Sequence, residues 1–246
     1  MRKLTVRILR AKPGQEKNAH FDEYCIEEKP RMSVLLVLDE IKETKDPSIY
    51  YESVCRSSIC GSCAIKINGQ PKLACKTQTS SLPDKITLEP LDVFPLIKDL
   101  AVDKSQFFEE LNKKLETWVH RQKEFKNLDE KISEELASQL YESERCIECG
   151  ICISACVAAS CAKFMGASGC GKGLRFVLDP RNEDKEAIKK LISVLASDEG
   201  LWGCHGIGAC EKFCPKEINL LKQLGKARIE VLKLIVKEWL KKPLKK

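Results

Sequence analysis

The chain has 246 residues, 14 of them cysteine, and a formal net charge of +6. This length allows two modest domains, each with a core of its own. The positive charge is spread along the chain and forms no stripe, which argues against a nucleic-acid-binding protein. We expect no signal peptide, because Met1-Arg2-Lys3 runs straight into the strand alternation of residues 4–8. We also expect no membrane span, because no apolar run approaches 18 residues. The clustered cysteines therefore predict metal binding in a reducing, cytosol-facing setting, not a disulfide framework.

Residues 1–104 have the alternation and turn signals of a small mixed domain. Alternating apolar residues predict strands over residues 4–8 and 21–28, and Ser33 can cap a helix that follows them. Asn68-Gly69 predicts the turn of a hairpin over residues 64–74, and residues 86–88 add a strand. Cys25 lies in one of these predicted strands, where we expect a buried, inert thiol.

Four cysteines of this first domain have the spacing of a plant-type [2Fe-2S] site, C-x4-C-x2-C followed by one more cysteine. They are Cys55, Cys60, Cys63 and Cys75. The loop must curl around a cluster and direct backbone N–H groups at the sulfurs, and Gly61 suits a close approach because it lacks a Cβ. A zinc site with the same ligands is the alternative. Zinc sites favour two C-x2-C pairs, and only Cys60 and Cys63 form one here.

From Asp103 and Gln106, which resemble a helix start, the character of the sequence changes. Apolar residues then recur at helical spacing in four stretches, so residues 105–246 are predicted to be helical, with these stripes as the core. The stripes are Phe108, Leu111, Leu115 and Trp118; Leu128, Ile132, Leu136 and Leu140; Ile188, Leu191, Ile192 and Leu195; and Leu221, Leu224, Leu232, Ile235 and Trp239. Residues 166–173 depart from a phosphate-binding loop and are predicted to be a Gly-rich turn.

A cysteine run over residues 145–156 organises the helical domain. Its spacing, C-x2-C-x2-C-x3-C, is that of bacterial ferredoxins, in which the fourth cysteine of the run binds the other of two clusters. A second run near the C-terminus repeats the pattern, with Ile207 where one cysteine would stand. Exchange of the fourth ligands predicts a [4Fe-4S] cluster held by Cys146, Cys149, Cys152 and Cys214.

The other cluster of this pair has only three cysteines, Cys156, Cys204 and Cys210. A cubane that lacks one thiolate tends to lose that iron, so this site is predicted to hold [3Fe-4S]. Cys161 and Cys170 are either packed thiols near a cluster or a replacement for the missing ligand, and the complete ferredoxin spacings favour packed thiols. His205 can donate a hydrogen bond near this cluster, or it is surface packing.

In this order, the three cysteine sets resemble the iron–sulfur subunits of succinate dehydrogenase and fumarate reductase. Further matches are Asn68-Gly69, the segments 73–75 and 94–100, Cys204-His205 and the segment 214–216. The resemblance implies an α+β chain with an N-terminal β-grasp ferredoxin domain, residues 1–104, and an all-α bacterial-ferredoxin-like domain, residues 105–246. It also implies that [2Fe-2S], [4Fe-4S] and [3Fe-4S] clusters lie in line.

The same resemblance implies two partners. An FAD-containing flavoprotein would carry the dicarboxylate site, and a membrane cytochrome b anchor with haem b would reach the quinone pool. This chain would then carry no catalytic residue and would pass electrons as a peripheral subunit on the cytoplasmic face of the inner membrane. We expect a fumarate reductase, with succinate dehydrogenase as the close alternative and a methylmenaquinol-linked or soluble fumarate reductase as a further one. Outside this class, the alternative is a metal-stabilised binding module without redox activity.

Two departures from the family pattern concern function. Ser57 and Ser58 stand where Glu-Gly is frequent, which changes the charge beside the [2Fe-2S] site. Cys161 occupies a position that carries a quinone-facing tryptophan in some members. This departure favours electrons passing onward to a haem over a quinone pocket beside the [3Fe-4S] cluster.

Overall fold

The computed structural model describes residues 2–116, 118, 119, 121 and 132–240. The chain divides into two compact units that interleave along the sequence. The first unit comprises residues 1–107, 147–155 and 213–216, and the second comprises residues 108–146, 156–212 and 217–246. Two short segments of the cysteine-rich half therefore belong to the first unit. The predicted division after residue 104 stays a prediction.

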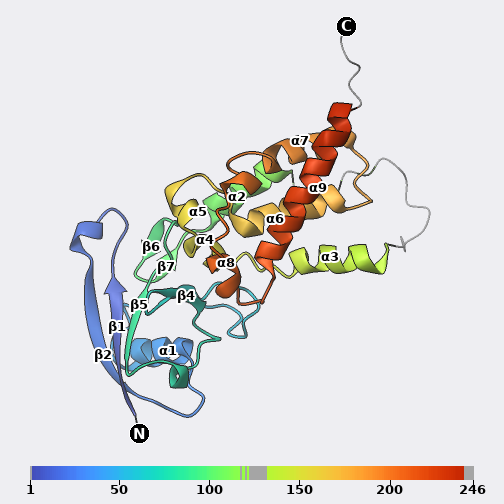
Figure 1. Cartoon of the computed structure of the whole chain (residues 1–246). Helices are drawn as coiled ribbons and strands as arrows, with labels where there is room; N and C mark the ends of the chain where they lie inside the picture. Colours follow the sequence, from blue (N-terminus) through green and yellow to red (C-terminus); the bar gives the residue numbers. More distant parts are fainter. Residues whose placement is uncertain (1, 117, 120, 122–131, 241–246) are drawn as a thin grey trace. The chain divides into compact units, whose positions relative to one another are not determined.

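A five-stranded sheet is the frame of the first unit (Figure 1). Its strand order is β2-β1-β5-β3-β4. Strand β1 pairs antiparallel with β2 and parallel with β5, and β3 pairs antiparallel with both β4 and β5. The predicted strands and the hairpin turned by Asn68-Gly69 are confirmed. The strands are β1 (Lys3–Arg10), β2 (His20–Glu27), β3 (Ala64–Ile67), β4 (Gln70–Leu73) and β5 (Lys85–Glu89).

The core of this unit follows from the two-residue period of its strands. Leu4, Val6 and Ile8 of β1 are fully buried, as the alternation predicts. Helix α1 (Val34–Thr44) begins at the predicted cap, where the Ser33 hydroxyl accepts a hydrogen bond from the Leu36 N–H at 3.3 Å. The unit also contains the short helices η1 (Glu16–Asn18), η2 (Thr79–Ser81) and α4 (Ile151–Ser154), and a small sheet of β6 (Leu96–Lys98) and β7 (Ala101–Val102).

The thiol of Cys25 is exposed, so the expectation that it is buried is wrong. Strand β2 lies at the edge of the sheet, and its side chains alternate between the two faces. Ile26 takes the buried position, which leaves Cys25 on the opposite face. The strand was predicted correctly, but the face on which the cysteine lies was not.

The second unit is built from helices, which confirms the predicted helical half. Helix α6 lies centrally and contacts α3, α7 and α9 (Figure 1). Among the described residues, none of the helices is both long enough and apolar enough to cross a membrane. The helices are α2 (Ser105–Leu115), which begins in the first unit, α3 (Glu134–Glu144), α5 (Val157–Cys161), α6 (Gly166–Leu178), α7 (Lys185–Leu195), η3 (Leu201–Gly203), α8 (Ala209–Lys212) and α9 (Leu220–Leu240).

Residues 166–173 open helix α6, so the prediction of a Gly-rich turn is wrong. A Cβ at Gly169 would lie 2.8 Å from the side chain of Leu111, and a Cβ at Gly173 would lie 2.8 Å from the side chain of Leu195. The glycines therefore permit α2 and α7 to pack closely against α6. Tertiary packing here outweighs the low intrinsic helix propensity of glycine.

The predicted apolar stripes form the core only in part. Leu111, Leu115, Leu140, Leu191, Leu195 and Leu224 are buried as expected, whereas Leu128 lies outside the described residues. Trp118 is 74% exposed because α2 ends at Leu115, three residues before it. In α9 the buried positions end at Val231, and the expectation that Leu232, Ile235 and Trp239 are core residues is wrong. The helix therefore extends beyond the core that its first turns help to form.

Candidate iron–sulfur sites

In the loop between α1 and β3, backbone N–H groups surround the sulfur of Cys55. The N–H groups of Ser57, Ile59 and Cys60 donate to it at 3.4, 3.2 and 3.2 Å. The Cys55 N–H in turn donates to the Cys60 sulfur at 3.4 Å. The sequence predicted this arrangement for a plant-type cluster loop. Such donors stabilise thiolate sulfur, so the residues present fit a [2Fe-2S] cluster.

The remaining two cysteines of this set lie together, with the sulfurs of Cys63 and Cys75 3.3 Å apart. Ser58 faces Cys75 twice, through its backbone N–H at 3.3 Å and its hydroxyl at 3.6 Å. Among the described residues, no three His, Cys, Asp or Glu side chains are grouped closely enough to hold one metal ion.

The thiols of this loop differ in acidity. Partial burial opposes ionisation of Cys60, but hydrogen bonds from the Ser62 hydroxyl, 3.1 Å away, and from backbone N–H groups prevail and lower the pKa of Cys60 to about 6. Burial raises the pKa of Cys63 to about 12. The exposed Cys60 therefore favours the thiolate form. The buried Cys63 would need the positive charge of bound iron before its thiol ionises.

The backbone of the loop turns through left-handed conformations. Arg56 and Ser58 have φ values of 57° and 59°, and Gly61 has a φ of 77°. Ser58 therefore adopts, at a cost, a conformation that glycine adopts freely. Arg56 pairs with Asp39, whose carboxylate also accepts a 2.6 Å hydrogen bond from the Tyr51 hydroxyl. This ion pair anchors the loop to α1.

Three of the four predicted [4Fe-4S] ligands belong to the first unit. Cys149 is buried, Cys152 is in α4, and Cys214 is in the segment 213–216. The segment that carries the first two cysteines turns sharply, with left-handed φ values of 50° at Glu148 and 82° at Gly150. Cys146 directly precedes this segment and belongs to the second unit. That these four cysteines hold one cluster stays a prediction.

The three predicted [3Fe-4S] ligands all belong to the second unit. Cys156 caps α5, Cys204 follows η3, and Cys210 is buried in α8. Burial raises the pKa of Cys210 to about 11, and the charges of Cys204 and Cys156 add to this effect. Cys204 and Cys156 therefore each lie within electrostatic reach of Cys210. The Gly206 N–H donates to the Cys204 sulfur at 3.4 Å.

Two residues in the segment between Cys204 and Cys210 are exposed. Ile207, at the position of the missing ligand, is 68% exposed between Gly206 and Gly208, which have φ values of 75° and 85°. His205 is also exposed and makes no hydrogen bond to a described residue. The predicted role of His205 beside the cluster stays a prediction, and the backbone of Gly206 supplies the observed donor to sulfur.

Cys161 and Cys170 have different surroundings. Cys161 is exposed at the end of α5, so the expectation of a packed thiol is wrong for it. Cys170 is completely buried in α6, and this burial, with the nearby Cys204, raises the pKa of its thiol. Cys170 is therefore the extra thiol that lies near the three-cysteine set.

Sequence reasoning missed Arg228, which supports the Cys204 turn from helix α9. Its guanidinium donates to the carbonyl oxygens of Leu201 at 2.8 Å and Cys204 at 2.6 Å. It also lies over the Trp202 ring, 5.6 Å from the ring centroid. The only sequence signal was an arginine next to the buried face of the last predicted helix, and no motif marks it.

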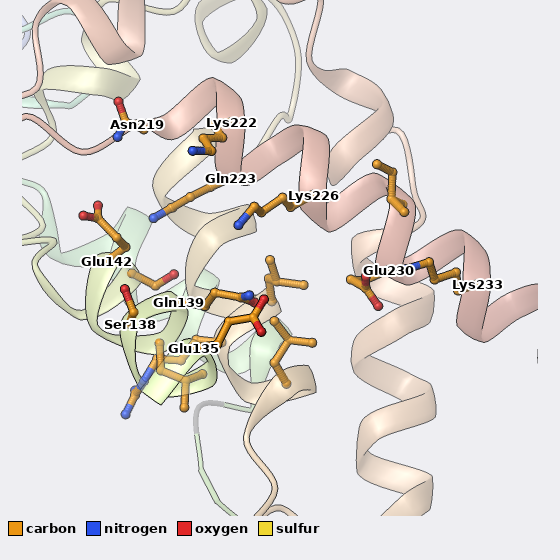
Figure 2. Close-up of a pocket in the computed structure, with 16 residues that line it drawn as sticks. Glu135, Ser138, Gln139, Glu142, Asn219, Lys222, Gln223, Lys226, Glu230 and Lys233 are labelled. Carbon is orange, nitrogen blue, oxygen red and sulfur yellow. Dashed lines mark hydrogen bonds and ion pairs between the residues drawn. The ribbon is translucent and has the colours of Figure 1, made fainter. Parts of the chain in front are cut away.

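A cavity of about 520 Å³ lies between α3, α6 and α9. Figure 2 shows side chains of α3, among them Glu142, facing those of α9, among them Gln223 and Lys226, across it. Glu142 Oε2, Gln223 Nε2 and Arg175 Nε are buried there and find no hydrogen-bond partner in the part of the chain that the structure describes. Unpaired buried polar atoms of this kind are suited to ordered water. No cysteine lines the cavity, so it is separate from the cluster sites.

Two family models match the chain. Residues 5–109 match a 2Fe-2S iron-sulfur cluster binding domain, and residues 142–218 match a 4Fe-4S dicluster domain. By fold, the chain resembles the Mycobacterium smegmatis Sdh1 complex in the apo form, with a TM-score of 0.84 at 22% identity over 94% of this chain and 96% of that one. These matches confirm the predicted α+β fold, a β-grasp-like [2Fe-2S] domain followed by a helical dicluster domain.

Curated relatives match over nearly their whole length. The fumarate reductase iron-sulfur subunit of Wolinella succinogenes is 41% identical, over 92% of this chain and 96% of that protein. The corresponding subunit of Haemophilus influenzae is 31% identical over 97% and 96%, and the succinate dehydrogenase iron-sulfur subunit of Coxiella burnetii is 31% identical over 93% and 97%. The chain belongs to the family of iron–sulfur electron-transfer subunits of succinate dehydrogenases and fumarate reductases.

Proposed function

We propose that this chain passes single electrons between an FAD-containing flavoprotein, which interconverts succinate and fumarate, and a quinone-reactive membrane subunit. The observation that carries the proposal is the ring of backbone N–H groups directed at the Cys55 and Cys75 sulfurs. Such donors stabilise a reduced, more negative cluster and so tune its potential. A purely structural metal site needs no such tuning.

The proposed ligand sets follow the cysteine spacing. Bound clusters would accept and release single electrons without bond making, and the chain's own residues hold the thiolates, donate hydrogen bonds to sulfur and exclude water. The burial of Cys149 and Cys210 supports the last role. The sets are Cys55, Cys60, Cys63 and Cys75 for [2Fe-2S]; Cys146, Cys149, Cys152 and Cys214 for [4Fe-4S]; and Cys156, Cys204 and Cys210 for [3Fe-4S].

Exposed apolar residues beside two of the sites support the proposed partners. Val54 and Ile59 are 77% and 63% exposed at the [2Fe-2S] loop. We assign the surface that they form to contact with the flavoprotein. Ile207 and the partly exposed Trp202 flank the three-cysteine site. We assign the surface that they form to contact with a membrane cytochrome b anchor that carries haem b. Through that anchor the chain would reach the quinone pool as a peripheral subunit on the cytoplasmic face of the membrane.

Fumarate reduction is the proposed physiological direction. Two of the relatives compared above, including the one at 41% identity, are named fumarate reductase subunits, whereas the named succinate dehydrogenase relative is 31% identical. In this direction electrons enter at the three-cysteine site and leave through the [2Fe-2S] loop. Rates of quinol-dependent fumarate reduction and succinate-dependent quinone reduction, measured on membranes that contain the complex, test this assignment. Faster succinate oxidation contradicts it.

The electron-transfer role is tested on the purified complex of this chain with its flavoprotein. After reduction with dithionite, EPR should show reduced iron–sulfur signals that disappear when fumarate is added. The same chain without the flavoprotein should keep these signals in the presence of fumarate. A colourless, zinc-containing chain contradicts the proposal.

A further inference from the structure

Gly61 of the [2Fe-2S] loop lies directly against the backbone of Cys149. A Cβ built at Gly61 would be 2.6 Å from the Cβ and 2.9 Å from the Cα of Cys149, and 3.3 Å from the carbonyl oxygen of Ile147. Gly61 is buried, and all three residues belong to the first unit. Only a hydrogen atom fits between this loop and the segment that carries a proposed [4Fe-4S] ligand.

A hydrogen bond also joins the segments that follow a proposed ligand of each of these two sites. The Lys76 ammonium donates a 2.8 Å hydrogen bond to the carbonyl oxygen of Pro215. Lys76 directly follows Cys75, and Pro215 directly follows Cys214. Each end of this bond is therefore one residue away from a proposed ligand, and the two ends serve different clusters.

Lys104 adds a brace to the first contact. Its ammonium donates to the Gly61 carbonyl oxygen at 3.4 Å, and its Cδ would lie 3.3 Å from a Cβ at Gly150. Gly150 itself is closed off by the ring of Phe94, 2.8 Å from the same Cβ position, and Phe94 packs edge-to-face on Phe107. The segment 147–155 is thus held against the [2Fe-2S] loop by packing as well as by hydrogen bonds.

We propose that Gly61 and Lys76 are positioning residues that fix the separation between the [2Fe-2S] and [4Fe-4S] sites. This inference rests on the ligand sets of the proposed function. In the transfer between the two sites, the donor cluster loses one electron and the acceptor cluster gains it, and no bond forms or breaks. The rate of such a transfer depends on distance, so residues that set the distance set the rate. The Gly61–Cys149 contact brings the two ligand-bearing segments together without an intervening side chain.

Gly61→Ala tests the contact because it adds one carbon at the point of closest approach. Non-bonded carbons prefer about 3.5–4.0 Å, so the 2.6 Å spacing to Cys149 must open by about 1 Å. Alanine also adds backbone strain at a φ of 77°. Gly69→Ala is the matched control. Gly69 has a φ of 73°, and nothing lies within 4 Å of its Cβ position, so this variant has the strain without the steric clash.

The readout is EPR power saturation of the reduced [2Fe-2S] signal in the assembled complex. A nearby reduced [4Fe-4S] cluster is also paramagnetic and speeds relaxation of that signal. In Gly61→Ala we expect the half-saturation power to shift to a lower value, while iron and sulfide content stays at the parent level. Gly69→Ala should saturate like the parent. Lys76→Met should shift the half-saturation power in the same direction, because it removes the hydrogen bond to Pro215 without adding bulk.

The outcomes separate this inference from the proposed function. If Gly61→Ala loses clusters, Lys76→Met, which leaves the contact intact, decides the question. Parent-like saturation in every cluster-loaded variant of Gly61 and Lys76 overturns the positioning role while leaving the ligand sets intact. An equal shift in Gly69→Ala also overturns it, because strain alone would then be the cause. A parent without a reduced [2Fe-2S] signal contradicts the ligand set, and the positioning role with it.

Discussion

The Arg228 guanidinium donates a 2.6 Å hydrogen bond to the carbonyl oxygen of Cys204. This bond links the last helix to the turn that presents a proposed cluster ligand. A fixed cation beside a cluster favours the reduced state, because reduction adds negative charge. The same guanidinium also binds the Leu201 carbonyl. Arg228 therefore both holds the turn in place and puts a positive charge beside it.

Arg228→Gln should lower the reduction potential of the three-cysteine cluster and reduce the free energy of unfolding by about 2 kcal/mol, because charge-assisted hydrogen bonds are lost. Arg228→Lys should keep much of the potential, since it keeps the charge. EPR-monitored redox titration and denaturant unfolding measure the two effects. Lys226→Gln, an exposed change in the same helix, is the control. An unchanged potential in Arg228→Gln would show that the residue acts on packing alone.

Ser58 offers a way to separate backbone strain from hydrogen bonding. Its hydroxyl lies 3.6 Å from the Cys75 sulfur, and its φ is 59°. Ser58→Ala should lower the [2Fe-2S] potential, because one donor to sulfur is lost. Ser58→Gly should lower it equally but stabilise the fold by about 1 kcal/mol, because glycine adopts this φ freely. Redox titration and thermal unfolding measure both variants, with Ser57→Ala as the control. Equal stability of the two Ser58 variants would contradict the expectation that the left-handed φ of Ser58 costs stability.

Cys60 should be the reactive thiol of the loop when clusters are absent. Its pKa is lowered to about 6, so its thiolate fraction and its alkylation rate should rise with pH through about 6 and level off above it. Cys63, whose pKa is raised to about 12, should stay unreactive near neutral pH. Ser62→Ala removes a hydrogen bond to the Cys60 sulfur and should move the midpoint to higher pH. Mass spectrometry of iodoacetamide adducts against pH checks this, and a midpoint near 9 would refute it.

Local sequence patterns predicted the regular elements and the cysteine sets. The alternation of Leu4, Val6 and Ile8 and the Ser33 cap are short-range signals, and both were confirmed. Cysteine spacing is as local, because a cluster loop must place its ligands within a few residues of one another.

What the sequence did not predict depends on tertiary neighbours. Gly169 lies within a helix, and its missing Cβ leaves the space that the Leu111 side chain occupies. Gly61 lies against Cys149, which is 88 residues away in sequence. Cys25 is exposed because its neighbour in the strand, Ile26, takes the core face. The role of Arg228 needs α9 to pass beside the Cys204 turn, which no local pattern encodes.

Cys214→Ser should damage the [4Fe-4S] cluster although Cys214 lies in the same run as Cys204 and Cys210. Cys214 belongs to the first unit together with Cys149 and Cys152, whereas the other two belong to the second. We expect loss of the reduced [4Fe-4S] signal and retention of the oxidised [3Fe-4S] signal, both measured by EPR. Cys25→Ser, at an exposed thiol, should change neither. Loss of the [3Fe-4S] signal alone would refute the exchange of fourth ligands.

Ile207→Cys should convert the proposed [3Fe-4S] cluster, at least in part, to [4Fe-4S]. Two residues separate Ile207 from Cys204 and two separate it from Cys210, which is the position where an intact ferredoxin run has a thiolate. Isoleucine has no lone pair to hold a fourth iron. The residue is 68% exposed between two glycines with left-handed φ values, so the position has room for a thiolate to reach the site.

The measurement for this variant is EPR of the oxidised protein, in which a [3Fe-4S] cluster is paramagnetic and a [4Fe-4S] cluster is silent. The oxidised signal should fall in Ile207→Cys, and iron content should rise. Turnover with quinol should fall too, because four-iron clusters commonly have lower potentials. Ile207→Ser, which supplies a weaker ligand in the same backbone, is the matched control and should convert less. An unchanged oxidised signal in Ile207→Cys would mean that the conformation of the loop, with Gly206 and Gly208 at its turns, dictates a three-iron cluster whatever side chain stands between them.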